Sequence, residues 1–157
     1  MSIKFSKRTS VEQVEEGEIL QPKFDENGLI PVITIDNNDD QVLMHGYMNK
    51  EALKLSIETE YAVYWSRSRK KLWKKGEKSG FYQKIKRILI DDDQDCLIIF
   101  VKLQGVQASC HVGYKSCFYR QIKKKKGKFS SDLVFNEDKK VFDPEKVYKG
   151  LDNPTKL

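Results

Sequence analysis

The alternation of apolar and polar residues divides the chain into strand-like segments with one clear helical segment between them. Residues 29–36 (LIPVITID) and 41–48 (QVLMHGYM) are rich in apolar and β-branched residues, and an Asn/Asp-rich turn at 37–40 separates them. This pattern predicts a hairpin with a four-residue loop. Pro31 lacks a backbone N–H, so we expect it at a sheet edge or a strand start.

Two helices are predicted. Asn49 is a favourable N-cap for a helix over residues 50–60, with Glu51 in its first turn. A weaker signal lies within residues 1–24, where Ser10 and Gln13 could form a capping box. The apolar residues expected to share a face are Ala52, Leu53 and Ile57 in the first case, and Val11 and Val14 in the second.

The rest of the first 120 residues is predicted to be strands and loops. The strands are residues 61–66, 81–90 and 96–103; residues 67–80 form a basic loop, and residues 104–117 a loop with two cysteines. Strands, one main helix and further strands predict an α+β fold dominated by antiparallel sheet.

Composition and length suit a soluble protein with one domain. Hydrophobic residues make up 39% and charged residues 33% of the 157 residues. We expect one domain over residues 1–120 and a polar, lysine-rich extension over 121–157, which is too short for a second catalytic domain. No apolar run approaches the roughly 20 residues that span a bilayer, and the N-terminus lacks the apolar core of a secretory signal. A cytoplasmic location is therefore expected.

Charge and cysteine content narrow the partners. The formal net charge of +6 favours anionic partners such as phosphates or nucleic acid. Three cysteines fit a reducing compartment better than a disulfide framework. Cys96 begins an apolar strand and is interpreted as a small buried hydrophobe. His45, inside another apolar strand, is interpreted as a core or interface histidine.

Four carboxylates fall within residues 91–95 (DDDQD). In an extended chain Asp91 and Asp93 would share one face, about 6.6 Å apart at Cα, with Asp92 on the other face. Two carboxylates at this spacing suit Mg²⁺, and Asp95 joins them only if the chain curls. A solvated acidic turn is the alternative, and an EF-hand fits poorly because the required Gly and closing Glu are missing.

Two further segments carry candidate chemistry. In residues 110–117 (CHVGYKSC), two thiols and an adjacent imidazole can ligate zinc, although the spacing differs from the usual C-x₂-C. The alternative is two packed thiols and a surface histidine. In residues 64–80 (YWSRSRKKLWKKGEKSG), arginines and serines can bind phosphate and tryptophans can stack on a base. This composition fits nucleotide or nucleic-acid binding, and also a basic solvated loop with core tryptophans.

Read in order, these segments resemble the phosphoribosyl-AMP cyclohydrolase family of histidine biosynthesis. The matching stretches, from LIPVITID to SCHVGYKSCFYR, cover about residues 24–120. The resemblance implies hydrolysis of the adenine ring of phosphoribosyl-AMP between N1 and C6 by an intertwined homodimer. It also implies zinc and magnesium as cofactors, and no nucleic-acid or membrane partner.

The resemblance assigns the metal ligands. Zinc would be held by Cys110 and Cys117 of one chain and by one residue from the acidic run of the other. The family carries a cysteine there, in the pattern D-C-D-x-D, whereas this chain has Asp92. Aspartate can bind zinc, so Asp92 is the predicted third ligand. His111 is the alternative third ligand. Cys96 lies four residues beyond Asp92, too far along the strand to replace it as a ligand. The implied magnesium ligands are Asp91, Asp93 and Asp95.

The remaining roles follow from the same resemblance. Zinc would activate the water that attacks C6, and His111 would carry a proton between this water and N1. Two rivals remain: an RNA-binding module with a structural zinc, and an inactive homologue that lacks the third zinc cysteine. The predicted substrate-binding residues are Trp65, Ser66, Arg67, Ser68, Arg69, Trp73, Lys75, Gly76, Glu77 and Ser79.

Overall fold

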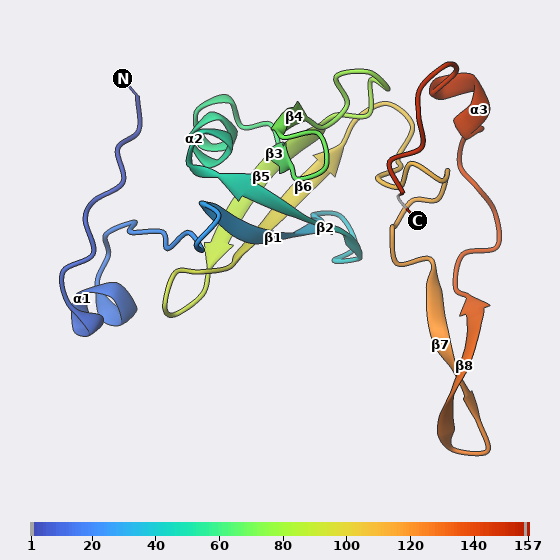
Figure 1. Ribbon diagram of the computed structural model, residues 1–157, viewed down its shortest axis with the longest axis horizontal. Coiled ribbons are helices and arrows are strands. Elements are labelled where there is room, and N and C mark those ends of the chain that lie inside the picture. The colour runs from blue at the N-terminus through green and yellow to red at the C-terminus, as the bar shows by residue number, and fades with distance from the viewer. Residues whose placement is uncertain (1, 156) are drawn as a thin grey trace.

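A computed structural model describes residues 2–155 and residue 157, and the core of the protein is a four-stranded sheet (Figure 1). The strand order is β2-β1-β6-β5; β1 and β6 are parallel, and the other neighbours are antiparallel. This confirms the predicted α+β class with mostly antiparallel sheet. The four strands are β1 (Leu29–Asp36), β2 (Val42–Asn49), β5 (Gln83–Ile90) and β6 (Leu97–Leu103).

The hairpin of β1 and β2 is confirmed. Its connection spans residues 37–41, slightly longer than predicted. Of the two positions expected for Pro31, the sheet edge is wrong, whereas Pro31 does lie near the start of its strand. β1 lies between β2 and β6, so it is an inner strand. The strand tolerates Pro31 because pairing with β6 begins only at Val32, one residue after the missing N–H.

Helix α2 (Lys50–Thr59) begins as predicted, with the Asn49 side chain accepting a hydrogen bond from the N–H of Ala52 at 2.8 Å. Its buried face differs by one residue, because Ser56 is fully buried whereas Ile57 is half-buried. The buried Ser56 hydroxyl makes two hydrogen bonds to the backbone of Val63. These bonds join α2 to the strand that follows it.

The N-terminal helix α1 (Val11–Glu16) is short. Oγ of Ser10 accepts a hydrogen bond from the N–H of Gln13 at 3.1 Å, as a helix cap does. The predicted shared apolar face is wrong, because Val14 is buried but Val11 is 72% exposed.

A second sheet corrects the expectation of a basic loop over residues 67–80. β3 (Val63–Ser66) and β4 (Lys71–Lys74) form an antiparallel hairpin. Leu72 and Trp73 interrupt the lysines, and the Trp73 ring packs 5.6 Å from the ring of buried Tyr64. These apolar contacts explain why so basic a segment forms a strand.

The C-terminal extension has its own structure. β7 (Arg120–Lys125) and β8 (Lys128–Phe135) form a hairpin that projects from the body, and α3 (Pro144–Val147) returns towards it (Figure 1). Residues 104–117 contain no helix or strand, as predicted. None of the described helices is both long and apolar enough to cross a membrane.

Candidate functional site

A cavity of about 1430 Å³ opens between β2, the β3–β4 hairpin, the cysteine loop and the C-terminal extension. All of the predicted substrate-binding residues line it, from Trp65 to Ser79, together with His111 and Cys117. Residues more than 50 positions apart in the sequence therefore meet at one hollow. Their binding role stays a prediction.

Two exposed arginines of this cavity are held by aromatic rings. The Arg67 guanidinium lies 4.2 Å from the centre of the Tyr47 ring, and that of Arg69 lies 5.5 Å from the Trp73 ring. Nε of Arg69 also donates a hydrogen bond to Oγ of Ser66 at 3.1 Å. These contacts orient two planar cations while leaving their remaining N–H groups free for an anion, and phosphate is the anion that such forks suit best.

Lys75 and Gly76 help to shape the cavity wall through contacts within the protein. Lys75 is buried, and its ammonium donates a hydrogen bond to the carbonyl of Ser109 at 2.7 Å. Burial lowers the pKa of Lys75, although the nearby thiols of Cys117 and Cys110 oppose this shift. Gly76 has φ 93°, and a Cβ there would lie 2.5 Å from the N atom of Tyr82, so only glycine fits.

A chain of buried polar groups connects the sheet to the cysteine loop. Tyr64 OH lies 2.6 Å from Oγ1 of Thr34 and donates to Oε1 of Gln83 at 2.7 Å. Nε2 of Gln83 then donates to Oγ of Ser109 at 3.1 Å. Burial raises the pKa of Tyr64, which keeps its hydroxyl neutral. Every member is buried, so this network fixes the residue next to Cys110.

The two cysteines of the loop lie side by side. Cys110 is buried, whereas Cys117 is exposed. The interaction between the two neighbouring thiols lowers the pKa of Cys110 and raises that of Cys117. Two adjacent sulfurs, one of them facing outward, fit a thiophilic metal such as zinc.

Both histidines of the chain line the cavity, and the interpretation of one of them, His45, as a core residue is wrong. His111 is half-buried, and burial lowers its pKa, while hydrogen bonding by Asn153 opposes that shift. Its Nε2 atom is buried without a hydrogen-bond partner, so it is available to a ligand. His45 is exposed at the cavity, with its ring 4.9 Å from that of Tyr47, so it is not a core histidine of this chain.

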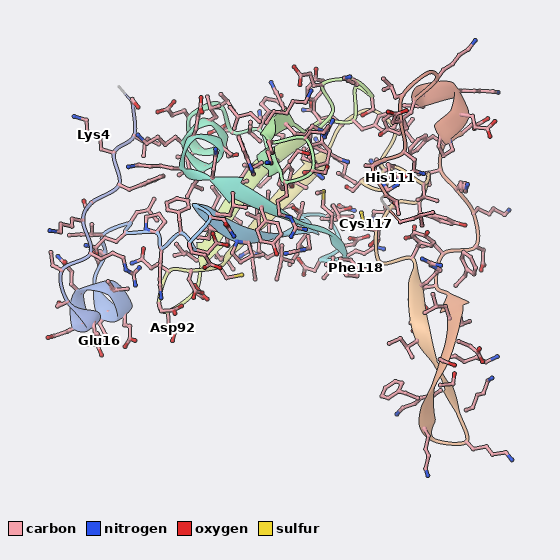
Figure 2. The ribbon with its side chains drawn as sticks, in the orientation of Figure 1. Lys4, Glu16, Asp92, His111, Cys117 and Phe118 are labelled. Atoms are coloured by element: carbon pink, nitrogen blue, oxygen red, sulfur yellow. The ribbon has the colours of Figure 1, made fainter. Side chains whose placement is uncertain are left out.

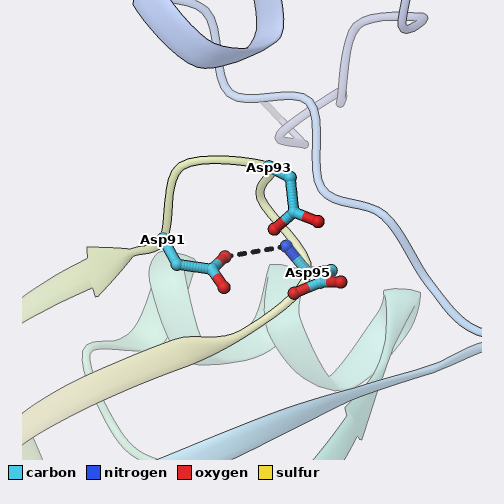
Figure 3. Close-up of side chains that lie close together, drawn as sticks. All are labelled: Asp91, Asp93 and Asp95. Carbon is cyan, nitrogen blue, oxygen red and sulfur yellow. Dashed lines mark hydrogen bonds between the residues drawn. The ribbon is translucent and has the colours of Figure 1, made fainter.

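The acidic run is a turn, and the extended conformation expected for it is wrong (Figure 3). Gln94 has φ 59°, and this curl lets the N–H of Asp95 donate to Oδ1 of Asp91 at 2.9 Å. Possible ligand oxygens of Asp91, Asp93 and Asp95 lie within 4.8 Å of one another. The curl is the condition under which Asp95 was expected to join, and three convergent carboxylates fit a hard cation.

The N-terminal segment holds this turn. Oε1 of the buried Gln94 accepts from the N–H of Gln21 at 2.7 Å, and its Nε2 donates to the carbonyl of Val14 at 3.0 Å. Arg8 donates to the carbonyl of Asp93 at 2.9 Å. Sequence reasoning missed these residues, because a glutamine between aspartates gives no sign of its distant partners.

The acidic turn and the cysteine loop lie at opposite ends of the sheet (Figure 2). The turn precedes the start of β6, whereas the N–H of Cys117 bonds the carbonyl of Leu43 where β2 begins. Asp92 is exposed at the turn and remote from Cys117. Within the described part of the chain, the three aspartates of the turn are the one group of three candidate metal ligands.

Cys96 corrects a further expectation. It is half-buried rather than buried, and its N–H donates to Oδ1 of Asp91 at 3.0 Å. Burial, followed by the charges of Asp91 and Asp95, raises the pKa of the Cys96 thiol. It therefore belongs to the acidic turn and lies away from the cysteine loop.

The C-terminal extension also lines the cavity, which the sequence analysis missed. Pro144, Tyr148 and Asn153 are among the lining residues. The available signal was Asp143 followed by Pro144, since an aspartate N-cap and a proline in the first turn begin many helices.

Comparisons with known proteins agree with the motif resemblance. The sequence model of the phosphoribosyl-AMP cyclohydrolase family matches residues 44–119. The chain is 51% identical to the phosphoribosyl-AMP cyclohydrolase of Methanoregula boonei over 130 residues, covering 83% of this chain and 96% of that protein. It is 52% identical to that of Methanococcoides burtonii over 126 residues, covering 80% and 94%. It is 46% identical to that of Brucella canis over 138 residues, covering 88% and 99%. The chain belongs to the phosphoribosyl-AMP cyclohydrolase family.

Proposed function

We propose that this protein hydrolyses the N1–C6 bond of the adenine ring of phosphoribosyl-AMP, a step of histidine biosynthesis, using zinc and magnesium as a homodimer. One observation carries the proposal: the predicted substrate residues, His111 and Cys117 line the same cavity. Relatives that bear this enzyme name are 51% and 52% identical to the chain over 130 and 126 residues. Together these observations favour the enzyme over an RNA-binding module.

The cavity offers complementary groups for a doubly phosphorylated nucleotide. Arg67 and Arg69, oriented by aromatic rings, would bind the phosphates with charge-assisted hydrogen bonds. Trp73 offers an aromatic surface near Lys75, whose ammonium lies 5.0 Å from the ring centre. The net charge of +6 would favour approach of this anionic substrate.

The donor sets fit the two metals of the family. Cys110 and Cys117 offer adjacent sulfurs to zinc, with Asp92 of the partner subunit as the proposed third ligand. Asp91, Asp93 and Asp95 offer convergent oxygens to magnesium. When bound, zinc supplies the Lewis acidity that makes water nucleophilic near neutral pH.

His111 is the proposed proton carrier. It follows Cys110 directly in the loop and faces the cavity, and its Nε2 has no partner within the protein. Burial lowers its pKa, which favours the neutral imidazole that can accept a proton from water. The same nitrogen would deliver the proton to N1 as the C6–N1 bond breaks.

A dimer accounts for the separation of the two metal-binding regions. Asp92 and Cys117 are both exposed but lie far apart in one chain, so a second chain is needed to bring them together (Figure 2). The projecting β7–β8 hairpin carries exposed apolar side chains that a partner could cover. They are Ile122, Phe129, Leu133, Val134 and Phe135.

Turnover and metal content, measured on one sample, test the proposal. Purified protein should hydrolyse phosphoribosyl-AMP, lose this activity on chelation, and regain it when zinc and magnesium are restored. Protein that carries stoichiometric zinc yet leaves phosphoribosyl-AMP intact would contradict the proposal. It would also support the inactive homologue.

Mixed dimers test the shared zinc site. Cys110→Ala subunits and Asp92→Ala subunits should each be inactive alone, and mixing them should restore activity because one of the two sites regains every ligand. If Asp92→Ala retains zinc and activity while His111→Ala loses both, the histidine is the third ligand instead.

A further inference from the structure

The C-terminal extension is anchored on the cysteine loop. The N–H of Val141 donates to the carbonyl of Gly113 at 2.7 Å, between the two cysteines. Gly113 has φ 113°, and a Cβ there would lie 2.8 Å from the carbonyl oxygen of Phe142. The extension therefore lies directly against a position where the loop has no side chain.

Aromatic contacts continue this anchor towards the cavity. The Phe142 ring lies 5.0 Å from the ring of buried Phe81 and 6.0 Å from that of Tyr148. Such edge-to-face pairs are more favourable than the burial of their apolar area alone. Phe142 thus joins the extension to the start of the segment that leads into β5.

Tyr148 lies between two parts of the site. Burial raises the pKa of Tyr148, and the nearby side chain of Ser79, a predicted substrate residue, opposes this shift. Tyr148, Ser79 and Asn153 all line the cavity. The extension therefore brings a hydroxyl and an amide to the side of the cavity where the cysteine loop and His111 lie.

The cavity remains hollow with the extension in place. With the extension as one of its walls, the cavity has a volume of about 1430 Å³. Ligand sites typically occupy about 300–1,000 Å³. A nucleotide therefore fits beside the extension, which borders the space rather than filling it.

We propose that residues 144–155, anchored through Val141 and Phe142, form a wall of the substrate cavity. Tyr148, with Ser79, then binds the substrate at the end nearest the cysteine loop. This inference rests on the proposed function and deepens it. It gives the extension a part in substrate binding, in addition to the part proposed for Arg67 and Arg69 of the β3–β4 hairpin.

Tryptophan fluorescence tests the wall without any turnover. The chain has two tryptophans, Trp65 and Trp73, and both line the cavity, so their quenching by acrylamide reports its accessibility. Phe142→Ala should release the extension and increase the quenching constant. Gln121→Ala is the matched control, because Gln121 belongs to the same extension but is exposed on the hairpin and does not line the cavity.

A second variant releases the extension in a different way, in case Phe142→Ala does not fold. Val141→Pro removes the N–H that bonds Gly113 at a residue whose side chain is 47% exposed. It should raise quenching as Phe142→Ala does, with an unchanged circular dichroism spectrum. Unchanged quenching in both folded variants would overturn the wall.

Steady-state kinetics tests Tyr148. Tyr148→Phe removes one hydroxyl, and losing one hydrogen bond of about 0.5–1.5 kcal/mol should raise KM for phosphoribosyl-AMP roughly two- to twelvefold, with little change in kcat. Tyr119→Phe is the control, since the Tyr119 ring stacks on Tyr114 outside the cavity. An unchanged KM in Tyr148→Phe would overturn its assignment.

The two proposals fail in different ways. If phosphoribosyl-AMP is not turned over but Phe142→Ala raises tryptophan quenching, the proposed function fails and the wall stands. If turnover is normal and quenching does not change in either anchor variant, the wall fails and the proposed function stands.

Discussion

The acidic turn and the cysteine loop are held by the same device at opposite ends of one sheet. Each is fixed by a buried glutamine, Gln94 in the turn and Gln83 beneath the loop. The turn gathers three candidate ligands from five consecutive residues. The loop offers two thiols, and among the described residues no third candidate metal ligand joins them in a group like that of the turn. In the proposed enzyme, a single chain supplies the carboxylates of the magnesium site, whereas the zinc site takes its third ligand from a second chain.

The largest expected effect separates the two metals. Cys110→Ala should lose zinc and reduce turnover to background, while Mn²⁺, used as a paramagnetic probe for magnesium, should still bind the acidic turn. Asp93→Asn should do the reverse, because it removes a carboxylate from the turn and leaves both thiols in place. Metal analysis and electron paramagnetic resonance measure both. Loss of both metals in either variant would show that the sites are one unit.

Breaking the polar network should have the next largest effect. Gln83→Leu leaves the Tyr64 and Ser109 hydroxyls each short of a partner. A buried group left unpaired costs about 1–3 kcal/mol, so the free energy of unfolding should fall by that amount or more. Zinc should also be lost faster to a chelator, since Ser109 precedes Cys110. Gln107→Leu, at an exposed residue, is the control for urea unfolding and zinc release.

The corresponding change in the turn should have a smaller effect on stability. Gln94→Gly removes the side-chain hydrogen bonds from residue 94 to the N-terminal segment. Glycine is chosen because it adopts the φ of 59° at this position without strain. We expect a loss of about 1–3 kcal/mol in the free energy of unfolding, and weaker Mn²⁺ binding with zinc retained. If Mn²⁺ affinity matches the wild type, the aspartates converge without the help of the N-terminal segment.

The comparison also shows what the sequence could predict. The β1–β2 hairpin and α2 depend on neighbouring residues, so their turn and cap signals sufficed. Convergence of Asp91, Asp93 and Asp95 was foreseen, but only the left-handed φ of Gln94 makes it possible, and a non-glycine residue gives little sign of that conformation.

The features that could not be predicted from the sequence depend on contacts between residues far apart in the chain. β4 was missed because Leu72 and Trp73 pack against partners that the sequence of residues 67–80 does not reveal. The buried chain from Thr34 to Ser109 joins four segments, and none of its members stands out locally. The same applies to Tyr148, which lines the cavity together with Ser79 although the two lie far apart in the sequence.

The smallest expected effect concerns an ion pair that joins the cysteine loop to the β1–β2 hairpin. Nζ of Lys115 lies 2.9 Å from Oδ2 of Asp36 and 2.8 Å from Oδ2 of Asp39. The hydrogen bond from Lys115 holds the pKa of Asp39 below its ordinary value of 3.8. A carboxylate with a lowered folded-state pKa stabilises the protein above its unfolded-state pKa, and this stabilisation disappears as the pH falls through the folded-state pKa.

Asp39→Asn removes this charge but keeps the Oδ1 acceptor that the N–H of Gln41 uses at 3.0 Å. At pH 7 the variant should be less stable by at most about 1 kcal/mol, because the Asp39 side chain is largely exposed and the pair is screened. The difference should shrink as the pH falls below the ordinary aspartate value, and also in high salt. Urea unfolding across this pH range measures it. A difference that persisted at low pH would mean that Asp39 acts through its hydrogen bonds, and the charge of Lys115 would then not be what joins the cysteine loop to the hairpin.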